Sequence, residues 1–567
     1  MRFPKWAPGI FLLVICTEIV HAQLKRDSPF NYTIQKKITC KNAAVVSAHP
    51  LASRVGLTIL RQGGNAIDAA IATQLALAVV YPGAGNIGGG GFTVLHLGNG
   101  KNITVDYRET APGLASRDMY LDTSGNPVMS LSQDGHLASG VPGVIAGLFA
   151  CMKYATMPFK KLVQPAIDLA ENGFALTAAQ AASLNHNRSD FLKFNNAPTV
   201  FVNATPWKAG DILIQKDLAK TLKRIRDKGR KGFYEGETAR LIVAEMQKGK
   251  GIITGDDLKR YSAKERTALE FDYGKYHIVT MPLPSSGGII LEQLMKIVEH
   301  RNIAGMRFQT AASVQLMTEA ERRAFADRAE FLGDPDFVKV PVTKLVSEPY
   351  LQERMSDYLP GKAGNSDITK AGIIKESEQT THLSVVDHLG NAVSVTTTLN
   401  NTYGGKTVVG GAGFILNDEM DDFSVKPGVP NMYGAIGNEK NAIAPGKRML
   451  SSMTPTIVLK KGRPFLVLGT PGGTTIPTSV FQTILNITAF GMNAEDAVNK
   501  PKFHHQWLPD SVYVERDFPV AVRNQLENMG YKIMARGDIG RTDLILIRKK
   551  KVIAIGDKRG DDDAEGY

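Results

Sequence analysis

Residues 380 to 400 carry the pattern that most restricts how this chain can fold. The segment Thr380 to Asp387 alternates apolar side chains on one face with mostly polar ones on the other. The segment Ala392 to Leu399 is β-branched almost throughout, which favours a strand. Between them lies a three-residue loop that ends in Gly390, where a left-handed conformation is needed and glycine adopts it at little cost. The pattern predicts a β-hairpin.

The loop length also fixes the register of this hairpin. If Asp387 lies opposite Asn391, then Thr380 lies opposite Thr398, with the two Cβ atoms about 5 Å apart. A threonine at the start of a strand, with a second hydroxyl across from it, is a candidate nucleophile. The same pattern is typical of an ordinary strand, because threonine favours strands. The rest of the chain has to decide between the two interpretations.

The composition is that of a soluble globular protein with a sizeable core. Of 567 residues, 43% are hydrophobic and 22% are charged, and the formal net charge is +12. The basic residues are dispersed, except for a dense run at 223–231 that continues a helical pattern and indicates a solvated helix face. Zinc-finger spacing and interleaved aromatic and basic residues are absent from the sequence, so nucleic acid is not an expected partner.

The first 22 residues have the pattern of a signal peptide. Arg2 and Lys5 precede an apolar stretch at 7–20, and Val20-His21-Ala22 is a small-residue cleavage site before Gln23. The apolar stretch is short for a membrane span. We therefore expect export to the periplasm or the extracellular space, with an uncleaved membrane anchor as the alternative.

Cysteine use agrees with an exported protein that is not a disulfide scaffold. Cys16 leaves with the signal peptide, and only Cys40 and Cys151 remain. The sequence leaves open whether these two pair.

Strand and helix patterns alternate along the chain and predict a layered α/β or α+β domain, with stacked sheets and helices outside. Near the N-terminus, a strand at Ala43–Ala48 precedes a helix at Leu51–Gln62 and a second, uncharged helix that Asn65 caps. A glycine-rich segment at 82–91 then leads into a strand. It lacks the Gly-Lys-Ser/Thr ending of a phosphate-binding loop and is better explained by close backbone packing.

Seven motifs follow one another along the chain. They are Asn86-Ile87-Gly88-Gly89-Gly90-Gly91-Phe92, Asp106-Tyr107-Arg108-Glu109, Pro284-Ser285-Ser286-Gly287-Gly288, Gln379-Thr380-Thr381-His382, Met420-Asp421-Asp422-Phe423-Ser424, Ser451-Ser452-Met453 and Pro471-Gly472-Gly473. In this order they identify the chain, from about residue 40 to 567, as similar to γ-glutamyltranspeptidases, which are N-terminal-nucleophile hydrolases.

This resemblance implies an α+β fold, a four-layer αββα sandwich built from two chains. The precursor would cut itself between Gln379 and Thr380, giving a large chain of residues 23–379 and a small chain of residues 380–567 that stay together as a heterodimer. Residues 360–379 are polar and rich in glycine and lysine, which fits an exposed loop that is cut.

The resemblance also implies the chemistry. Thr380 would attack the γ-carbonyl of glutathione or another γ-glutamyl compound, with its own α-amine, of ordinary pKa near 8, as the base. The γ-glutamyl ester would pass to water, an amino acid or a dipeptide. The backbone amides of Gly472 and Gly473 would form the oxyanion hole. Neither a cofactor nor a metal is expected, and His382, His504 and His505 are interpreted as structural.

The remaining site residues follow from the same resemblance, position by position. The substrate carboxylate would be held by Arg108, Ser451 and Ser452, since an arginine fork and hydroxyls suit it. Its ammonium group would be held by Asn400, Glu419 and Asp422. Thr398 would orient the nucleophile, and Tyr433 would close the site as a lid.

Two alternatives remain at this stage. One is a related acylase that cleaves glutaryl or similar side chains, which would need no ammonium-binding residues. The other is a catalytically silent exported binding protein on the same scaffold, against which an intact Thr380 with its cut site argues.

Overall fold

The computed structural model describes residues 28–366, 380–429, 431, 437–549 and 551–567. The predicted signal peptide, Gln379 on one side of the predicted cut, and Tyr433 of the predicted lid lie outside these residues. In the described part of the chain, no helix has both the length and the apolar character needed to cross a membrane. Cys40 and Cys151 are both free thiols, so the pairing that the sequence left open does not occur.

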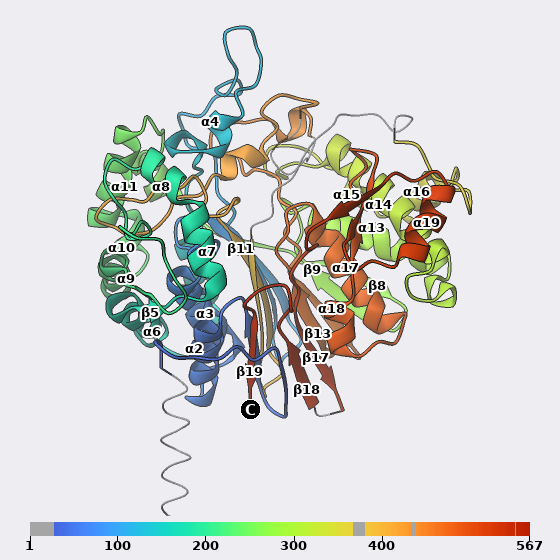
Figure 1. The fold of residues 1–567 in the computed structure, drawn as a ribbon, viewed down its shortest axis with the longest axis horizontal. Helices are drawn as coiled ribbons and strands as arrows, with labels where there is room; N and C mark the ends of the chain where they lie inside the picture. Colours follow the sequence, from blue (N-terminus) through green and yellow to red (C-terminus); the bar gives the residue numbers. More distant parts are fainter. Residues whose placement is uncertain (1–27, 367–379, 430, 432–436, 550) are drawn as a thin grey trace, which may run out of the picture.

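Two seven-stranded antiparallel sheets form the centre of the molecule (Figure 1). The first, which we call the hairpin sheet, contains in spatial order β19 (Asp563–Gly566), β2 (Ala44–Ser47), β10 (Thr381–Val386), β11 (Ala392–Thr398), β3 (Gly90–His96), β4 (Asn102–Asp106) and β7 (Lys264–Arg266). The second sheet contains β1 (Lys37–Cys40), β18 (Lys551–Ile555), β17 (Asp543–Arg548), β13 (Arg463–Gly469), β12 (Thr456–Lys460), β9 (Tyr276–Thr280) and β8 (Leu269–Tyr273).

Helices cover the outer face of each sheet. On the outer side of the hairpin sheet, either on the sheet or on one another, lie α2 (Pro50–Arg61), α3 (Ala66–Val80), α5 (Val144–Cys151), α6 (Phe159–Asn172), α7 (Ala178–His186), α8 (Arg188–Phe194), α9 (Lys216–Lys228), α10 (Lys231–Tyr234), α11 (Gly236–Lys248) and α12 (Gly255–Arg260). On the second sheet lie α13 (Gly287–His300), α14 (Ala311–Phe331), α16 (Glu348–Arg354), α17 (Thr475–Thr488), α18 (Ala494–Asn499) and α19 (Val520–Asn528). The order of layers is therefore helix, sheet, sheet, helix, and the predicted αββα sandwich is confirmed.

Shorter elements complete the description. They are α4 (Ser130–Gln133), α15 (Val342–Leu345), the two-stranded β5 (Phe174–Ala175) and β6 (Ile212–Leu213), and the three-stranded β14 (Phe503–His504), β15 (Val512–Glu515) and β16 (Ile533–Arg536).

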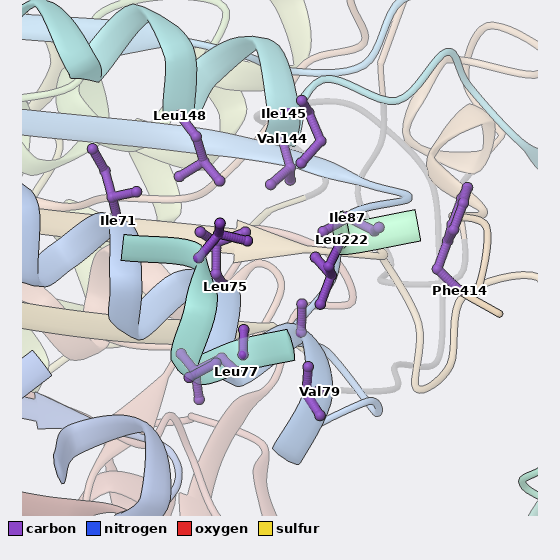
Figure 2. Packing of buried hydrophobic residues seen from close by; sticks show 14 of the residues in the cluster. Ile71, Leu75, Leu77, Val79, Ile87, Val144, Ile145, Leu148, Leu222 and Phe414 are labelled. Atoms are coloured by element: carbon purple, nitrogen blue, oxygen red, sulfur yellow. The ribbon is translucent and has the colours of Figure 1, made fainter. Parts of the chain in front are cut away.

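Three apolar layers hold the sandwich together, one between the sheets and one under each set of helices. Figure 2 shows the layer under α3, where Ile71, Leu75 and Val79 of α3 lie near Leu148 of α5 and Leu222 of α9. Full burial of such a side chain stabilises a fold by about 1.5–3 kcal/mol. Because α3 is buried on every side, its near absence of charge is explained.

The cap of α3 also forms as predicted. The side-chain oxygen of Asn65 accepts hydrogen bonds from the backbone N–H groups of Ile67 and Asp68, both at 2.9 Å. The Asp68 carboxylate in turn accepts from the Asn65 N–H at 2.8 Å. This reciprocal arrangement fixes where the helix begins.

The predicted hairpin register is confirmed. His382 pairs with Thr396 and Ser384 with Ser394, and Gly390 has φ +88°. Extending this register by one residue places Thr380 opposite Thr398. The polar face of the hairpin is buried against the second sheet rather than exposed to solvent, and the Ser394 hydroxyl donates to the Leu468 carbonyl at 2.9 Å.

The glycine-rich segment packs closely against the hairpin, as predicted. A Cβ on Gly89 would lie 2.1 Å from the Thr398 carbonyl oxygen, and one on Gly88 would lie 2.1 Å from that of Ile415. Only glycine permits this approach. The segment therefore fixes the end of β11, where the candidate site lies.

Candidate active site

A single pocket lies at the ends of β10 and β11, and we call it the Thr380 pocket. Thr380 is only 6% exposed and directly precedes β10, while Thr398 ends β11. The pocket brings together every predicted site residue that the structure describes except Gly472, which adjoins it. Its lining is Arg108, Arg328, Thr380, Thr398, Asn400, Glu419, Asp422, Asn431, Ser451, Ser452, Met453, Gly473, Thr474 and Ile476.

Thr398 and Asn400 are coupled through the backbone. The Asn400 N–H donates to the Thr398 hydroxyl oxygen at 2.7 Å. Asn400 itself has φ +81°, a left-handed conformation that asparagine tolerates better than most residues. Its side-chain amide donates to the Asp418 carbonyl at 3.1 Å. The turn after β11 thus brings both residues to the same pocket.

Arg108 follows β4 and is fully buried between carboxylates. Its two terminal nitrogens donate to Glu419 and Asp422, and the Glu109 carboxylate lies 3.5 Å away. From the sequence we assigned Arg108 to the substrate carboxylate and the two acids to the ammonium group. Arg108 therefore contacts both of these acids directly, so members of the two predicted sets lie in one cluster.

Burial gives these acids unusual proton affinity. Desolvation, opposed by Arg108 and supported by Asp422, raises the pKa of Glu419 to about 8. Burial likewise raises the pKa of Asp422, against the lowering effect of Arg108. Burial raises the pKa of Glu109 well above its ordinary value. The cluster is therefore a place where an additional cation, such as an ammonium group, would be stabilised.

Ser451 and Ser452 also line the pocket, and we call these two residues the serine shelf. The backbone N–H and the hydroxyl of Ser286 both donate to the Ser451 carbonyl at 2.7 Å. The Ser451 hydroxyl oxygen accepts from the Met453 N–H at 3.2 Å. A Cβ on Gly287 would lie 2.1 Å from the Thr454 hydroxyl, which explains the glycine at this position. The motif around Ser286 therefore fixes the backbone of the serine shelf through these hydrogen bonds.

Gly472 and Gly473 form a tight turn at the start of α17, with φ of +135° and +53°. Their carbonyls accept from Thr475 and Ile476 at 2.9 and 3.2 Å. Within the described part of the chain, neither glycine N–H donates to another residue. Donors available at a helix N-terminus are suited to a developing negative charge.

The histidines that we interpreted as structural are buried hydrogen-bonding groups. His382 lies between Thr396 and Ser384, and burial lowers its pKa to about 3. His504 lies between Thr478 and Gln506, with its pKa lowered to about 3 mainly by burial. Among the described residues, no cluster of three or more His, Cys, Asp or Glu side chains is arranged to hold a metal ion.

Sequence reasoning missed several residues of the pocket. Asn431 donates its side-chain amide to Asp422 at 2.9 Å, and Arg328 reaches the pocket from α14. Charged residues are frequent in α14 from Glu319 onward, and no local pattern distinguishes Arg328 from the others. The packing that buries α14 on nearly every side and brings Arg328 to the pocket is evident only in the folded structure.

Comparison with known proteins gives consistent matches. Residues 52–567 match the family model described as gamma-glutamyltranspeptidase. The glutathione hydrolase proenzyme of Escherichia coli (strain K12) is 46% identical over 528 residues, covering 92% of this chain and 91% of the relative. The crystal structure of cephalosporin acylase from Bacillus halodurans is similar over 100% of both chains, with TM-score 0.82 and 25% identity. That of Helicobacter pylori gamma-glutamyltranspeptidase covers 57% of this chain and 94% of its own, with TM-score 0.55 and 44% identity.

Proposed function

The chain belongs to the γ-glutamyltranspeptidase family, and we propose on that premise how its residues process the precursor and act on glutathione and other γ-glutamyl compounds. One observation carries the proposal. Thr380 lies at a strand start, opposite Thr398, in a pocket that also holds buried cationic and anionic groups. A zwitterionic glutamyl group needs both kinds of charge beside the nucleophile.

The first step is the cut between Gln379 and Thr380. The Thr380 hydroxyl attacks the Gln379 carbonyl, the acyl group moves from nitrogen to oxygen, and water hydrolyses the ester. The products are a large chain ending at Gln379 and a small chain beginning at Thr380. They remain a heterodimer because β10 and β11 of the small chain pair with β2 and β3 of the large chain.

The cut gives Thr380 a free α-amine, which serves as the base for its own hydroxyl. The hydroxyl oxygen attacks the γ-carbonyl carbon of the donor, and the N–H groups of Gly472 and Gly473 bind the resulting oxyanion. In comparable acyl transfers such a donor is worth about 3 kcal/mol. The amine of the donor leaves, cysteinylglycine in the case of glutathione. Water, an amino acid or a dipeptide then takes the γ-glutamyl group from the ester.

The glutamyl group takes over contacts that Arg108 makes with Glu419 and Asp422. Its ammonium group binds Asn400, Glu419 and Asp422, and its carboxylate binds Arg108 with the Ser451 and Ser452 hydroxyls. Because one cation and one anion enter together, the net charge of the pocket is unchanged. Tyr433, outside the described residues, is assigned to a lid over this pocket.

The carboxylate cluster favours a γ-glutamyl donor over the glutaryl donor of the acylase alternative, because glutaryl compounds carry no ammonium group. Residues 1–22 are assigned to a signal peptide that exports the protein to the periplasm or beyond the cell. The family match argues against the catalytically silent alternative, because the similar proteins are glutathione hydrolase proenzymes.

The test is a denaturing gel beside a donor assay. We expect two bands of the large and small chains, and release of p-nitroaniline from γ-glutamyl-p-nitroanilide but far less from glutaryl-p-nitroanilide. Thr380→Ala should give one uncut band and no release. A single band with no release from the unaltered protein would contradict the proposal.

A further inference from the structure

Arg328 is a second arginine in the Thr380 pocket with a different environment from Arg108. It lies near the C-terminal end of α14, in the helical layer of the second sheet (Figure 1). Its side chain lines the pocket, yet the residue is only 7% exposed. Its Nε donates to the Ser286 hydroxyl at 3.1 Å, and one terminal nitrogen lies 3.5 Å from the Ser452 hydroxyl.

No carboxylate pairs with Arg328 in the described part of the chain. Its hydrogen bonds go to two neutral hydroxyls, and its remaining terminal nitrogen has no hydrogen-bond partner among the described residues. Arg108 contrasts with it, since two carboxylates bind that guanidinium directly. So does Arg323, also buried on α14, which pairs with Glu319 and Asp357.

A buried cation without an anion is costly. Burial and the neighbouring Arg108 lower the pKa of Arg328, and Asp422 raises it, with a result of about 10, so the guanidinium stays charged at neutral pH. Removing a charge from water without pairing it is strongly unfavourable. The arrangement is accounted for if an anion from outside the chain completes it when the pocket is filled.

The position of Ser452 indicates which anion this is. A glutathione-like donor has one carboxylate on the glutamyl group and one on the leaving peptide. The leaving peptide must depart to solvent, whereas Arg328 is enclosed and adjoins the serine shelf. The glutamyl carboxylate on Ser451 and Ser452 would therefore lie next to the unpaired nitrogen of Arg328.

We propose that Arg328 binds the α-carboxylate of the γ-glutamyl donor together with the Ser452 hydroxyl, as a second cation beside Arg108. This inference rests on the proposed function. Ser286 holds the guanidinium in place, and the donor carboxylate supplies the direct ion pair that no carboxylate of the described residues makes with it. Arg328 thereby contributes to selection of donors that carry a carboxylate at this position.

The test combines Arg328→Gln with three donors that differ by one group. γ-Glutamyl-p-nitroanilide carries both charges, glutaryl-p-nitroanilide lacks the ammonium group, and 4-aminobutyryl-p-nitroanilide lacks the carboxylate. We expect KM to rise roughly 10- to 100-fold for the first two, as for the loss of a hydrogen bond to a charged group. For the third we expect a change below about 2-fold. A donor that turns over too slowly is measured by its inhibition constant against γ-glutamyl-p-nitroanilide.

Arg323→Gln is the matched control, because Arg323 is 5% exposed on the same helix and does not line the pocket. It should lower stability without changing the ranking of donors. If Arg328→Gln is not processed, Arg328→Lys replaces it; with the charge kept but the fork lost, it should raise KM for the two carboxylate donors alone.

The outcomes separate the two proposals. An equal penalty on all three donors, in an enzyme whose unaltered form is active, overturns the inference and leaves Arg328 a structural role. A penalty with glutathione but not with γ-glutamyl-p-nitroanilide also overturns it, because the bound group would then be the leaving peptide's carboxylate. An unaltered protein that releases no p-nitroaniline contradicts the proposed function instead.

Discussion

The side-chain amide of Asn86 donates to the backbone carbonyl of Thr398 at 2.9 Å. The same Asn86 accepts from the Gly89 N–H at 2.8 Å through its side-chain oxygen. One asparagine thus ties the glycine-rich segment to the strand end that faces the nucleophile. The glycine-rich segment therefore helps to position Thr398, although none of its own side chains lines the pocket.

Gly89→Ala should disturb this strand end. The new Cβ would lie 2.1 Å from the Thr398 carbonyl oxygen, a backbone atom that cannot move away alone. We expect a loss of about 1–3 kcal/mol in the free energy of unfolding, as for other overpacked positions, together with slower self-cleavage. Urea unfolding and a time course of band appearance on gels measure the two effects.

Gly255→Ala is the control for that substitution, since nothing lies within 4 Å of its added Cβ. It should leave processing unchanged. Normal processing and stability in Gly89→Ala would show that the close approach is not needed.

Thr398→Val should lower kcat/KM for γ-glutamyl-p-nitroanilide by roughly 10- to 100-fold. The buried Asn400 N–H loses its acceptor, at a cost of about 1–3 kcal/mol, and Thr380 loses the hydroxyl opposite. Thr398→Ser keeps the oxygen and should retain most of the activity. Similar rates for the valine and serine variants would exclude a role for this hydroxyl.

Gly473→Ala should act on kcat rather than KM. Its φ of +53° strains any residue with a Cβ by about 1–2 kcal/mol, and relief of that strain turns its N–H away from the oxyanion. Because the oxyanion exists only after attack, we expect kcat to fall about 10- to 100-fold with KM within about 2-fold. Gly462→Ala, at φ +70° in open space, applies similar strain elsewhere. If both variants lose kcat equally, strain alone is responsible.

Stability should depend on pH through Glu419. Its pKa in the folded protein is raised from 4.5 to about 8 by burial, so the bound proton stabilises the fold. This contribution is fully present below pH 4.5 and is lost as pH rises through about 8. We expect the free energy of unfolding to decline over this interval relative to Glu419→Gln, which needs no proton to stay neutral. Parallel pH profiles in urea unfolding would contradict this.

Local patterns were enough to predict the elements that hold the nucleophile. The register of the hairpin follows from loop length, and the start of α3 from the Asn65 cap, because both depend on residues close in the chain. Some boundaries differ from prediction by a residue: the strand expected at Ala43–Ala48 spans Ala44–Ser47, and the helix expected at Leu51–Gln62 spans Pro50–Arg61.

Contacts between distant segments could not be predicted in this way. Arg108 and Glu419 are 311 positions apart, and nothing local to either shows that the two side chains contact each other. The resemblance to a known family supplied the members of the site but not their pairing. Arg328 escaped notice for the same reason, since its environment is made by Ser286 and Ser452 from other segments.

The hairpin sheet contains strands from both sides of the proposed cut, with β10 lying between β2 and β11. Before the cut, all of its strands belong to one polymer and form by a unimolecular process. After the cut, refolding requires two polypeptides to meet, so recovery from denaturant becomes dependent on concentration. The mature enzyme then persists mainly because it unfolds slowly. An uncut chain is needed for efficient folding but not for catalysis.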